Sequence, residues 1–305
     1  MVGFDGLSTS LHNRIPAHTR ERLRALAADA IDAAGVRTTL PTPMVTVQRA
    51  VGLRHRLDIR RMPEHILRDF SPPGRDVLGL LVYDWATVFV DTALPAARVQ
   101  FTDAHETGHW LCDWHRSAAL KFDTTREFYG PAAVEMEAEA NFLGAELMFQ
   151  GDVFLDAMEQ TPAGIDGGLW LAERFGASRH ATLLHLARVS SAAVALAVAA
   201  PQPNADGTYP LWQTIESPSF LRTFGTLDHL LPTGRLRLRG GALGDQLWHA
   251  RARPHHPQTR RVGIPDGTTT RQSFYCDALY TGYATLVLFT EAAAISMPRG
   301  VSRVA

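Results

Sequence analysis

The sequence predicts an α+β protein in which a metal-binding helical part precedes a second α+β part. Three observations support this. Residues 105–109 read HETGH, a spacing that places two imidazoles on one face of a helix. Residues 131–149 carry apolar side chains at three- and four-residue intervals, which is typical of an amphipathic helix. β-Rich runs, over residues 77–91 and 192–199, lie on either side of these two segments in the chain.

The N-terminal elements are predicted in the following order. Arg20–Ala34 has the periodicity of an amphipathic helix, and Pro43–Val51 predicts a second helix. A short strand is expected near Leu57–Arg60. The runs Val77–Tyr83 and Thr87–Asp91 flank a turn and predict a hairpin. The second run leads into the HETGH segment, so we expect a strand beside that helix.

The HETGH pentapeptide requires a helical context. Asp103–His115 is predicted to be a helix, and Thr102 can cap it. Gly108 is a poor residue for the interior of a helix, costing about 1 kcal/mol against Ala. We therefore expect another element to pack closely against the helix at this glycine.

The pentapeptide itself indicates a metal centre. His105 and His109 lie one turn apart, so both imidazoles can bind one divalent cation. Glu106 projects beside them, where it can act on water as a general base. This is the core of a zinc-dependent hydrolase, and it needs a third ligand.

His115 is one candidate for that third ligand. It lies six residues after His109, which is the spacing of the HExxHxxGxxH signature, but the halfway position is Cys112 instead of Gly. A continuous helix would carry His115 about 240° around from His109, onto the wrong face. The alternative is an ordinary histidine near a helix end.

The helix predicted over Pro131–Phe149 offers carboxylates instead. Glu135, Glu137 and Glu139 all fall in it. Glu137 precedes Asn141 by four residues, so a carboxylate for the metal and an amide for a ligating histidine project from the same face. For any one of these glutamates taken alone, the alternative is a solvated helix face.

These two segments together resemble a known family. QFTDAHETGHWL, followed downstream by EAEANFLGAELM, is similar to the RFTxAHExGHxL and ExEANxFAAxLLMP motifs of the ImmA/IrrE zinc metallopeptidases. The resemblance covers about residues 20–190 and implies a zincin-like, gluzincin-type metallopeptidase fold. It implies a bound Zn²⁺ with metal ligands His105, His109 and Glu137, the general base Glu106, the supporting residue Asn141, and Glu139 as the alternative ligand.

The chain departs from the family pattern in three places. Gln100 stands where the family usually has Arg, Asp103 where it usually has an aliphatic residue, and Phe149-Gln150 where it usually has Met-Pro. None of these residues takes part in the metal chemistry. Gln100 removes any ion pair that the family makes at that position.

The predicted domain organisation is a metallopeptidase domain over residues 1–150, a helical segment over 151–190 and a C-terminal α+β sensor-like domain over 191–305, for regulation or substrate docking. Leu169–Val189 has the outline of a helix-turn-helix, whose second helix, Arg179–Arg188, is the one that would enter a DNA groove. It carries few basic residues for phosphate contacts, so a packing role is expected.

Composition indicates a cytoplasmic protein. The net charge of −1 gives no global electrostatic case for nucleic acid. Two cysteines, Cys112 and Cys276, are too few for a disulfide framework. The longest apolar run, Ala192–Ala200, is far below the roughly 20 residues that a membrane span needs.

Two functions from different classes follow. The resemblance implies a site-specific endopeptidase that cleaves a helix-turn-helix transcriptional repressor in a stress or mobile-element response. The alternative is a non-catalytic zinc protein that regulates by binding DNA, through residues 169–189, or a protein partner. An intact Glu106 argues against the alternative, because a structural zinc site needs no base. Tyr83, Tyr129 and His180 are the candidates for stabilising an oxyanion, and the sequence does not choose among them.

Overall fold

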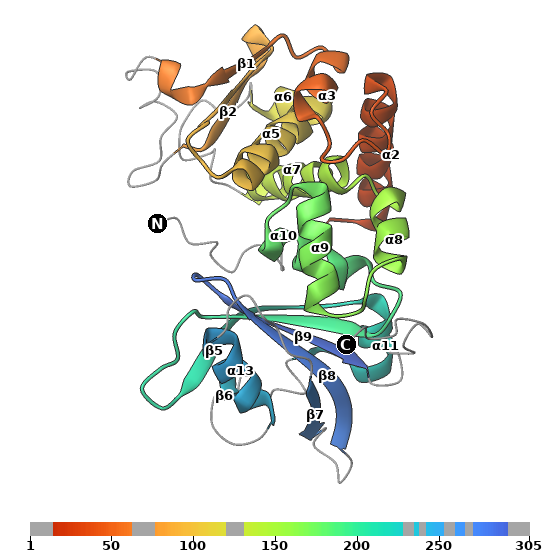
Figure 1. Ribbon diagram of the computed structural model, residues 1–305. Helices are drawn as coiled ribbons and strands as arrows, with labels where there is room; N and C mark the ends of the chain where they lie inside the picture. The colour runs from red at the N-terminus through yellow and green to blue at the C-terminus, as the bar shows by residue number, and fades with distance from the viewer. Residues whose placement is uncertain are drawn as a thin grey trace, which may run out of the picture. The chain divides into compact units, whose positions relative to one another are not determined.

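The computed structural model describes residues 15–62, 77–119, 131–227, 235–237, 242–252, 260–265 and 271–291. These residues form two compact units. One lies within residues 1–159 and 171–178, and the other within 160–170 and 179–305. The first unit is mainly helical and the second is built on an antiparallel sheet, which confirms the mixed α+β class (Figure 1). The predicted domain boundaries at residues 150 and 190 stay a prediction.

The helices of the first unit agree closely with the periodicity of the sequence. Helix α7 (Pro131–Phe149) has the predicted bounds, and α2 (Ala17–Ala34) and α3 (Met44–Ala50) lie within a few residues of theirs. Helix α2 ends at Gly35, whose φ of 64° is the left-handed conformation that glycine adopts readily. The other described helices that lie wholly within this unit are α5 (Ala96–Leu111), α6 (Asp113–Ala119) and α8 (Asp152–Glu159).

A three-stranded sheet lies beside helix α5. Its order is β1 (His55–Asp58), β3 (Thr87–Val90), β2 (Gly79–Val82), with β1 parallel and β2 antiparallel to β3. The predicted hairpin is therefore confirmed. The strand expected near Leu57–Arg60 forms slightly earlier, because the chain turns into a short 3₁₀ helix over Ile59–Arg61. Apolar side chains join this sheet to α5: Val88, Val90, Leu81, Val99 and Trp110.

The prediction that Thr102 caps the metal helix was wrong. Helix α5 begins two turns earlier, at Ala96 after Pro95, and Thr102 is a buried residue in its interior. Proline is favoured at the start of a helix because it lacks the N–H that would be unsatisfied there. The residues from Ala96 onward contain no proline, and the helix runs unbroken through Gly108 to Leu111.

Helices α5 and α7 pack against each other (Figure 1). Each contributes a glycine where the backbone of the other helix approaches closely. A Cβ on Gly108 of α5 would lie 2.9 Å from the carbonyl oxygen of Ala140. A Cβ on Gly144 of α7 would lie 3.1 Å from the backbone nitrogen of His105. The expectation of close packing at Gly108 is thus confirmed. The crossing brings the side chains of α7 within reach of the two histidines.

Replacing Gly108 with Ala should destabilise the protein. The added methyl group must push α5 and α7 apart, and overpacking of this kind costs about 1–3 kcal/mol, partly offset by the about 1 kcal/mol that Ala gains in helix propensity. Denaturant unfolding of the metal-free protein measures this change. Gly144→Ala is the matched comparison, and it should cost less because its closest contact is longer. A fully stable Gly108→Ala variant would contradict the close crossing.

The second unit contains a six-stranded antiparallel sheet in the order β6-β5-β4-β9-β8-β7. Strands β4 (Val194–Ala199) and β9 (Thr285–Glu291) are its centre and are buried almost throughout. Strand β4 forms within the β-rich run expected over residues 192–199. The other strands are β5 (Thr208–Glu216), β6 (Arg235–Arg237), β7 (Arg260–Pro265) and β8 (Arg271–Tyr280).

Both faces of this sheet bury apolar side chains. On one face, Ala195 and Ala197 of β4 lie in one core with Phe220 of α11 (Pro218–Phe224) and Leu247 of α13 (Ala242–Ala252). The small alanines leave room for the larger side chains of these neighbours.

Helices α9 (Ile165–Phe175) and α10 (Arg179–Val189) form the predicted helix, glycine turn and helix, with Gly176 at a φ of 62° between them. Helix α10 packs against β4 and β5. Its residues from Thr182 to Ala187 are all buried. This helix presents little surface, as a packing role predicts. Within the part of the chain that the structure describes, every helix is too short or too polar to cross a membrane.

Candidate metal centre

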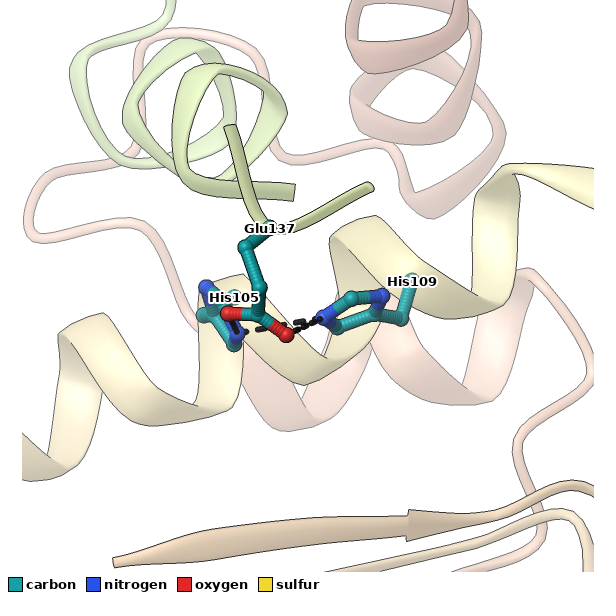
Figure 2. A group of neighbouring side chains, drawn as sticks. All are labelled: His105, His109 and Glu137. Carbon is teal, nitrogen blue, oxygen red and sulfur yellow. Dashed lines mark hydrogen bonds and ion pairs between the residues drawn. The ribbon is translucent and has the colours of Figure 1, made fainter. Parts of the chain in front are cut away.

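The three residues expected to bind a metal come together in the structure. His105 and His109 project from α5, and Glu137 reaches them from α7 (Figure 2). The two Nε2 atoms are 3.2 Å apart. The Glu137 carboxylate oxygens lie 3.4 Å from Nε2 of His105 and 3.3 Å from Nε2 of His109. One ligand atom from each residue lies within 4.8 Å of the others.

This donor set fits a zinc ion. Two imidazole nitrogens and one carboxylate oxygen are ligands that zinc prefers, and three protein ligands leave a coordination position open. The side chains of His105 and His109 are only 15% and 13% exposed, whereas that of Glu137 is 52% exposed. Solvent therefore reaches the cluster mainly beside Glu137. Among the described residues this is the one group of three such side chains close enough to share an ion.

Asn141 supports His105 as expected from its spacing to Glu137. Its Oδ1 lies 3.1 Å from Nδ1 of His105. When Nδ1 carries the proton and donates it to the amide oxygen, Nε2 keeps its lone pair for a metal. One turn of α7 therefore supplies both a candidate ligand, Glu137, and the hydrogen-bond partner of another candidate ligand, His105.

The charges within the cluster depend on each other in the metal-free protein. Burial lowers the pKa of His105, but the Glu137 carboxylate outweighs it and raises this pKa to about 9. Burial lowers the pKa of His109. Desolvation opposes ionisation of Glu137, but His105 and the hydrogen bonds from both histidines hold its pKa well below the usual range. In the metal-free protein Glu137 is therefore ionised and His105 is protonated. The proton must leave His105 before its Nε2 can bind a metal.

Glu106 is buried against strand β2. It is 8% exposed and lies between α5 and strand β2, where the backbone N–H of Leu81 donates to its carboxylate. A Cβ on Gly79 would lie 2.8 Å from Oε1 of Glu106, so only glycine lets the strand approach this closely. Burial raises the pKa of Glu106 to about 7. A carboxyl group with a pKa near neutrality can both take and return a proton.

The three candidates for an oxyanion partner have different outcomes. The Tyr83 hydroxyl donates to the carbonyl oxygen of His109, 3.1 Å away, and its ring stacks on Trp110. Tyr83 therefore stabilises the C-terminal end of α5. His180 belongs to the other compact unit, and Tyr129 lies outside the described residues.

His115 was expected to lie on the wrong face of a continuous helix, and the helix is not continuous. Helix α5 ends at Leu111, and the backbone bends at Cys112, with φ −89° and ψ 89°, before α6 begins. The bend returns His115 toward the site. Its Nδ1 lies 3.0 Å from Nδ1 of His109, and its ring is completely buried.

Glu139 does not face the histidine pair of the candidate metal site. Its Oε2 accepts a hydrogen bond from Nε1 of Trp114 at 2.6 Å and lies 2.8 Å from Nε2 of His115. Burial raises its pKa, but these two hydrogen bonds outweigh that effect and lower the pKa below its usual value. Glu139 is thus a carboxylate that contacts His109 only through His115. Sequence reasoning missed this pairing, because it depends on the bend of the backbone at Cys112.

The departures from the family pattern are each accommodated locally. Asp103 is 4% exposed and forms an ion pair with Arg56 of β1 through two hydrogen bonds of 3.0 Å. Nε2 of Gln48 lies 3.3 Å from the same carboxylate. Gln100 donates to the carbonyl oxygen of Phe175 at 3.3 Å, and Gln150 binds the backbone near Val36 and Thr39.

Comparison with known proteins agrees with this geometry. Residues 62–186, which contain the whole cluster, match the family model Peptidase_M78, described as the IrrE N-terminal-like domain. A solved structure of a Mycobacterium tuberculosis transcriptional regulator matches 93% of this chain and 80% of its own, with a TM-score of 0.59 and 15% identity. At that identity the likeness shows the fold alone. A search of curated proteins gave no match. Residues 62–186 of this chain are therefore a Peptidase_M78 domain, and its resemblance to the ImmA/IrrE family is confirmed.

Proposed function

We propose that this protein is a zinc-dependent endopeptidase. The observation that carries the proposal is the convergence of His105, His109 and Glu137 beside a buried Glu106. A purely structural zinc site is usually closed by a fourth protein ligand, whereas a catalytic site keeps a position open. Three ligands and a nearby carboxyl group of raised pKa match the catalytic arrangement.

The chain's own residues supply the proton transfers. His105, His109 and Glu137 would hold a zinc ion, which would supply Lewis-acid polarisation of a peptide carbonyl and a lowered pKa of water. Glu106 takes a proton from the attacking water and later donates it to the leaving amine. Asn141 keeps His105 in the tautomer whose Nε2 faces the site.

Strand β2 is the proposed docking edge for an extended substrate. Among the described strands it pairs with β3 on one side only, and Leu81 on this strand contacts Glu106. A peptide added to the free edge would form backbone hydrogen bonds and pass beside the metal ligands. Recognition through an extended segment suits cleavage at selected sites in exposed loops.

We propose a helix-turn-helix transcriptional repressor as the substrate, cleaved in a stress or mobile-element response. Support comes from the IrrE-like domain and from a neighbour in fold that is itself called a transcriptional regulator. The test is a comparison of new protein N-termini in cells expressing wild type or Glu106→Gln. A small set of termini within such repressors, seen with wild type alone, is the expected result. Identical sets of termini would leave the non-catalytic alternative.

The alternative, a zinc protein that regulates by binding DNA or a protein partner, has less support. Its proposed DNA-reading helix, α10, is buried from Thr182 to Ala187. A recognition helix must present an exposed face to the major groove. Full activity of a Glu106→Gln variant in cells would favour this alternative.

Metal affinity should rise with pH. His105 must be neutral to bind a metal through Nε2, and its pKa in the metal-free protein is raised to about 9. Binding near neutral pH therefore releases a proton, and affinity should increase about tenfold per pH unit until the pH exceeds this pKa. Competition with a chromophoric chelator between pH 6.5 and 9.5 measures the slope. A flat profile would contradict the raised pKa.

A further inference from the structure

A line of four side chains runs from the candidate metal site into the interior. Nδ1 of His109 contacts Nδ1 of His115, and Nε2 of His115 contacts Oε2 of Glu139. The same oxygen accepts the indole N–H of Trp114. The guanidinium of Arg22, from α2, lies 4.1 Å from the centre of the Trp114 ring. Helices α2, α5 and α7 and the short α6 thus each contribute a side chain to this line, which begins at the candidate ligand His109.

The hydrogen bonds of this line allow one consistent set of tautomers for neutral rings. A carboxylate only accepts hydrogen bonds, so His115 must present Nε2–H to Glu139. Nδ1 of His115 is then an acceptor, and His109 must present Nδ1–H to it. Nε2 of His109 is left with its lone pair directed at Glu137 and His105. Without the carboxylate, both tautomers of His115 would be available.

We infer that His115 and Glu139 are positioning residues, which fix His109 in the tautomer and orientation that binds the metal. This inference rests on the proposed zinc site. It differs from the support given to His105, where a single amide of Asn141 contacts the ring. Outer partners of ligating histidines typically change metal affinity or activity by about 10–100-fold when removed, because they orient the ring and increase its basicity.

The first test is the tautomeric state of the histidines in the zinc-loaded protein. Long-range ¹H–¹⁵N correlation spectra distinguish Nδ1–H from Nε2–H in each ring. We expect Nε2–H for His115 and Nδ1–H for His109, with slow exchange of the latter proton because it is buried. In His115→Phe the Nδ1–H signal of His109 should broaden or exchange rapidly. A proton on Nδ1 of His115 in the wild type would overturn the inference.

The second test is zinc affinity, measured by competition with a chromophoric chelator. His115→Phe removes both hydrogen bonds and should weaken binding by about 10–100-fold. Glu139→Gln keeps the shape and an acceptor but loses the charge, so a smaller loss is expected. His115→Asn can accept from His109 and donate to Glu139, and it should recover part of the affinity lost in His115→Phe.

A matched control separates positioning from general damage to the core. Thr107 is also a completely buried polar residue of α5, but its hydroxyl contacts only Asp103 and Gln48 among the hydrogen bonds found here. Thr107→Val should lower thermal stability without changing zinc affinity. If zinc affinity in His115→Phe and Glu139→Gln equals that of the wild type, the positioning role is wrong.

One further variant distinguishes failure of this inference from failure of the proposed function. Glu137→Ala removes a ligand and should bind zinc far more weakly than either positioning variant. If Glu137→Ala loses zinc while His115→Phe keeps wild-type affinity, only the positioning role fails. If Glu137→Ala also keeps wild-type affinity, the zinc site itself is wrong.

Discussion

Replacing Glu106 with Gln is expected to abolish peptide cleavage while zinc remains bound. The amide has the same shape as the carboxyl group but cannot take a proton from water, and loss of a general base typically costs about 10²–10⁴-fold in rate. A peptide substrate with a fluorescent reporter, taken from a mapped cleavage site, measures this rate. Zinc content by elemental mass spectrometry should equal that of the wild type.

The same variant should be more stable than the wild type in the metal-free state. Burial raises the pKa of Glu106 to about 7 in the folded protein, whereas the ordinary value of 4.5 applies in the unfolded chain. Between these two values the unfolded chain loses its proton more readily than the folded protein does. The folded protein therefore loses stability as the pH rises from 4.5 toward 7. The difference corresponds to about 3 kcal/mol at most. Denaturant unfolding at pH 4.5 and 8 should show a gain for Glu106→Gln only at the higher pH. Glu135→Gln, at an exposed position of α7, is the control. Equal stability of both variants at pH 8 would contradict the buried setting of Glu106.

Replacing Glu137 with Ala is expected to cause the largest loss of metal. Zinc sites in small folded peptides bind with about 10–16 kcal/mol in total, so one ligand accounts for roughly 3–4 kcal/mol, or several hundred-fold in affinity. The variant also removes the carboxylate that raises the pKa of His105, so that pKa should fall toward the value set by burial. Chelator competition and histidine titration by NMR measure the two effects.

The control for this prediction lies on the same helix. Glu135→Ala removes an exposed carboxylate two residues earlier and should leave zinc content unchanged. If Glu137→Ala keeps zinc and His115→Ala loses it, the ligand assignment is wrong. Cleavage activity should disappear together with the metal in Glu137→Ala and persist in Glu135→Ala.

Local periodicity predicted most of what the metal centre needs. The bounds of α7 follow from Pro131 and the regular apolar spacing, because both act within one helix. The spacing of His105 to His109 fixes their common face. Glu137 and Asn141 follow from the same rule, combined with the family resemblance. These predictions depend on neighbours along the chain, so they can be made before the structure is known.

The parts that could not be predicted depend on contacts between distant segments. Nothing from Cys112 to Ala119 marks a helix end, since this stretch contains neither Gly nor Pro, and the bend that returns His115 is visible only in three dimensions. The pairing of Glu139 with His115 depends on that bend. The start of α5 was misplaced for a different reason, because Thr102 is a suitable cap by type but Pro95 begins the helix first.

The buried ion pair between Asp103 and Arg56 limits how far the metal helix can be exchanged between relatives. Asp103 stands where the family usually has an aliphatic residue, and Arg56 and Gln48 come from other elements to meet it. A chimaera that received α5 from a relative would leave Arg56 without its partner, and because the Arg56 side chain is 24% exposed, the cost should be below the about 3–5 kcal/mol of a fully buried pair. Recombination of homologous segments should therefore succeed only when residues 48, 56 and 103 are inherited together.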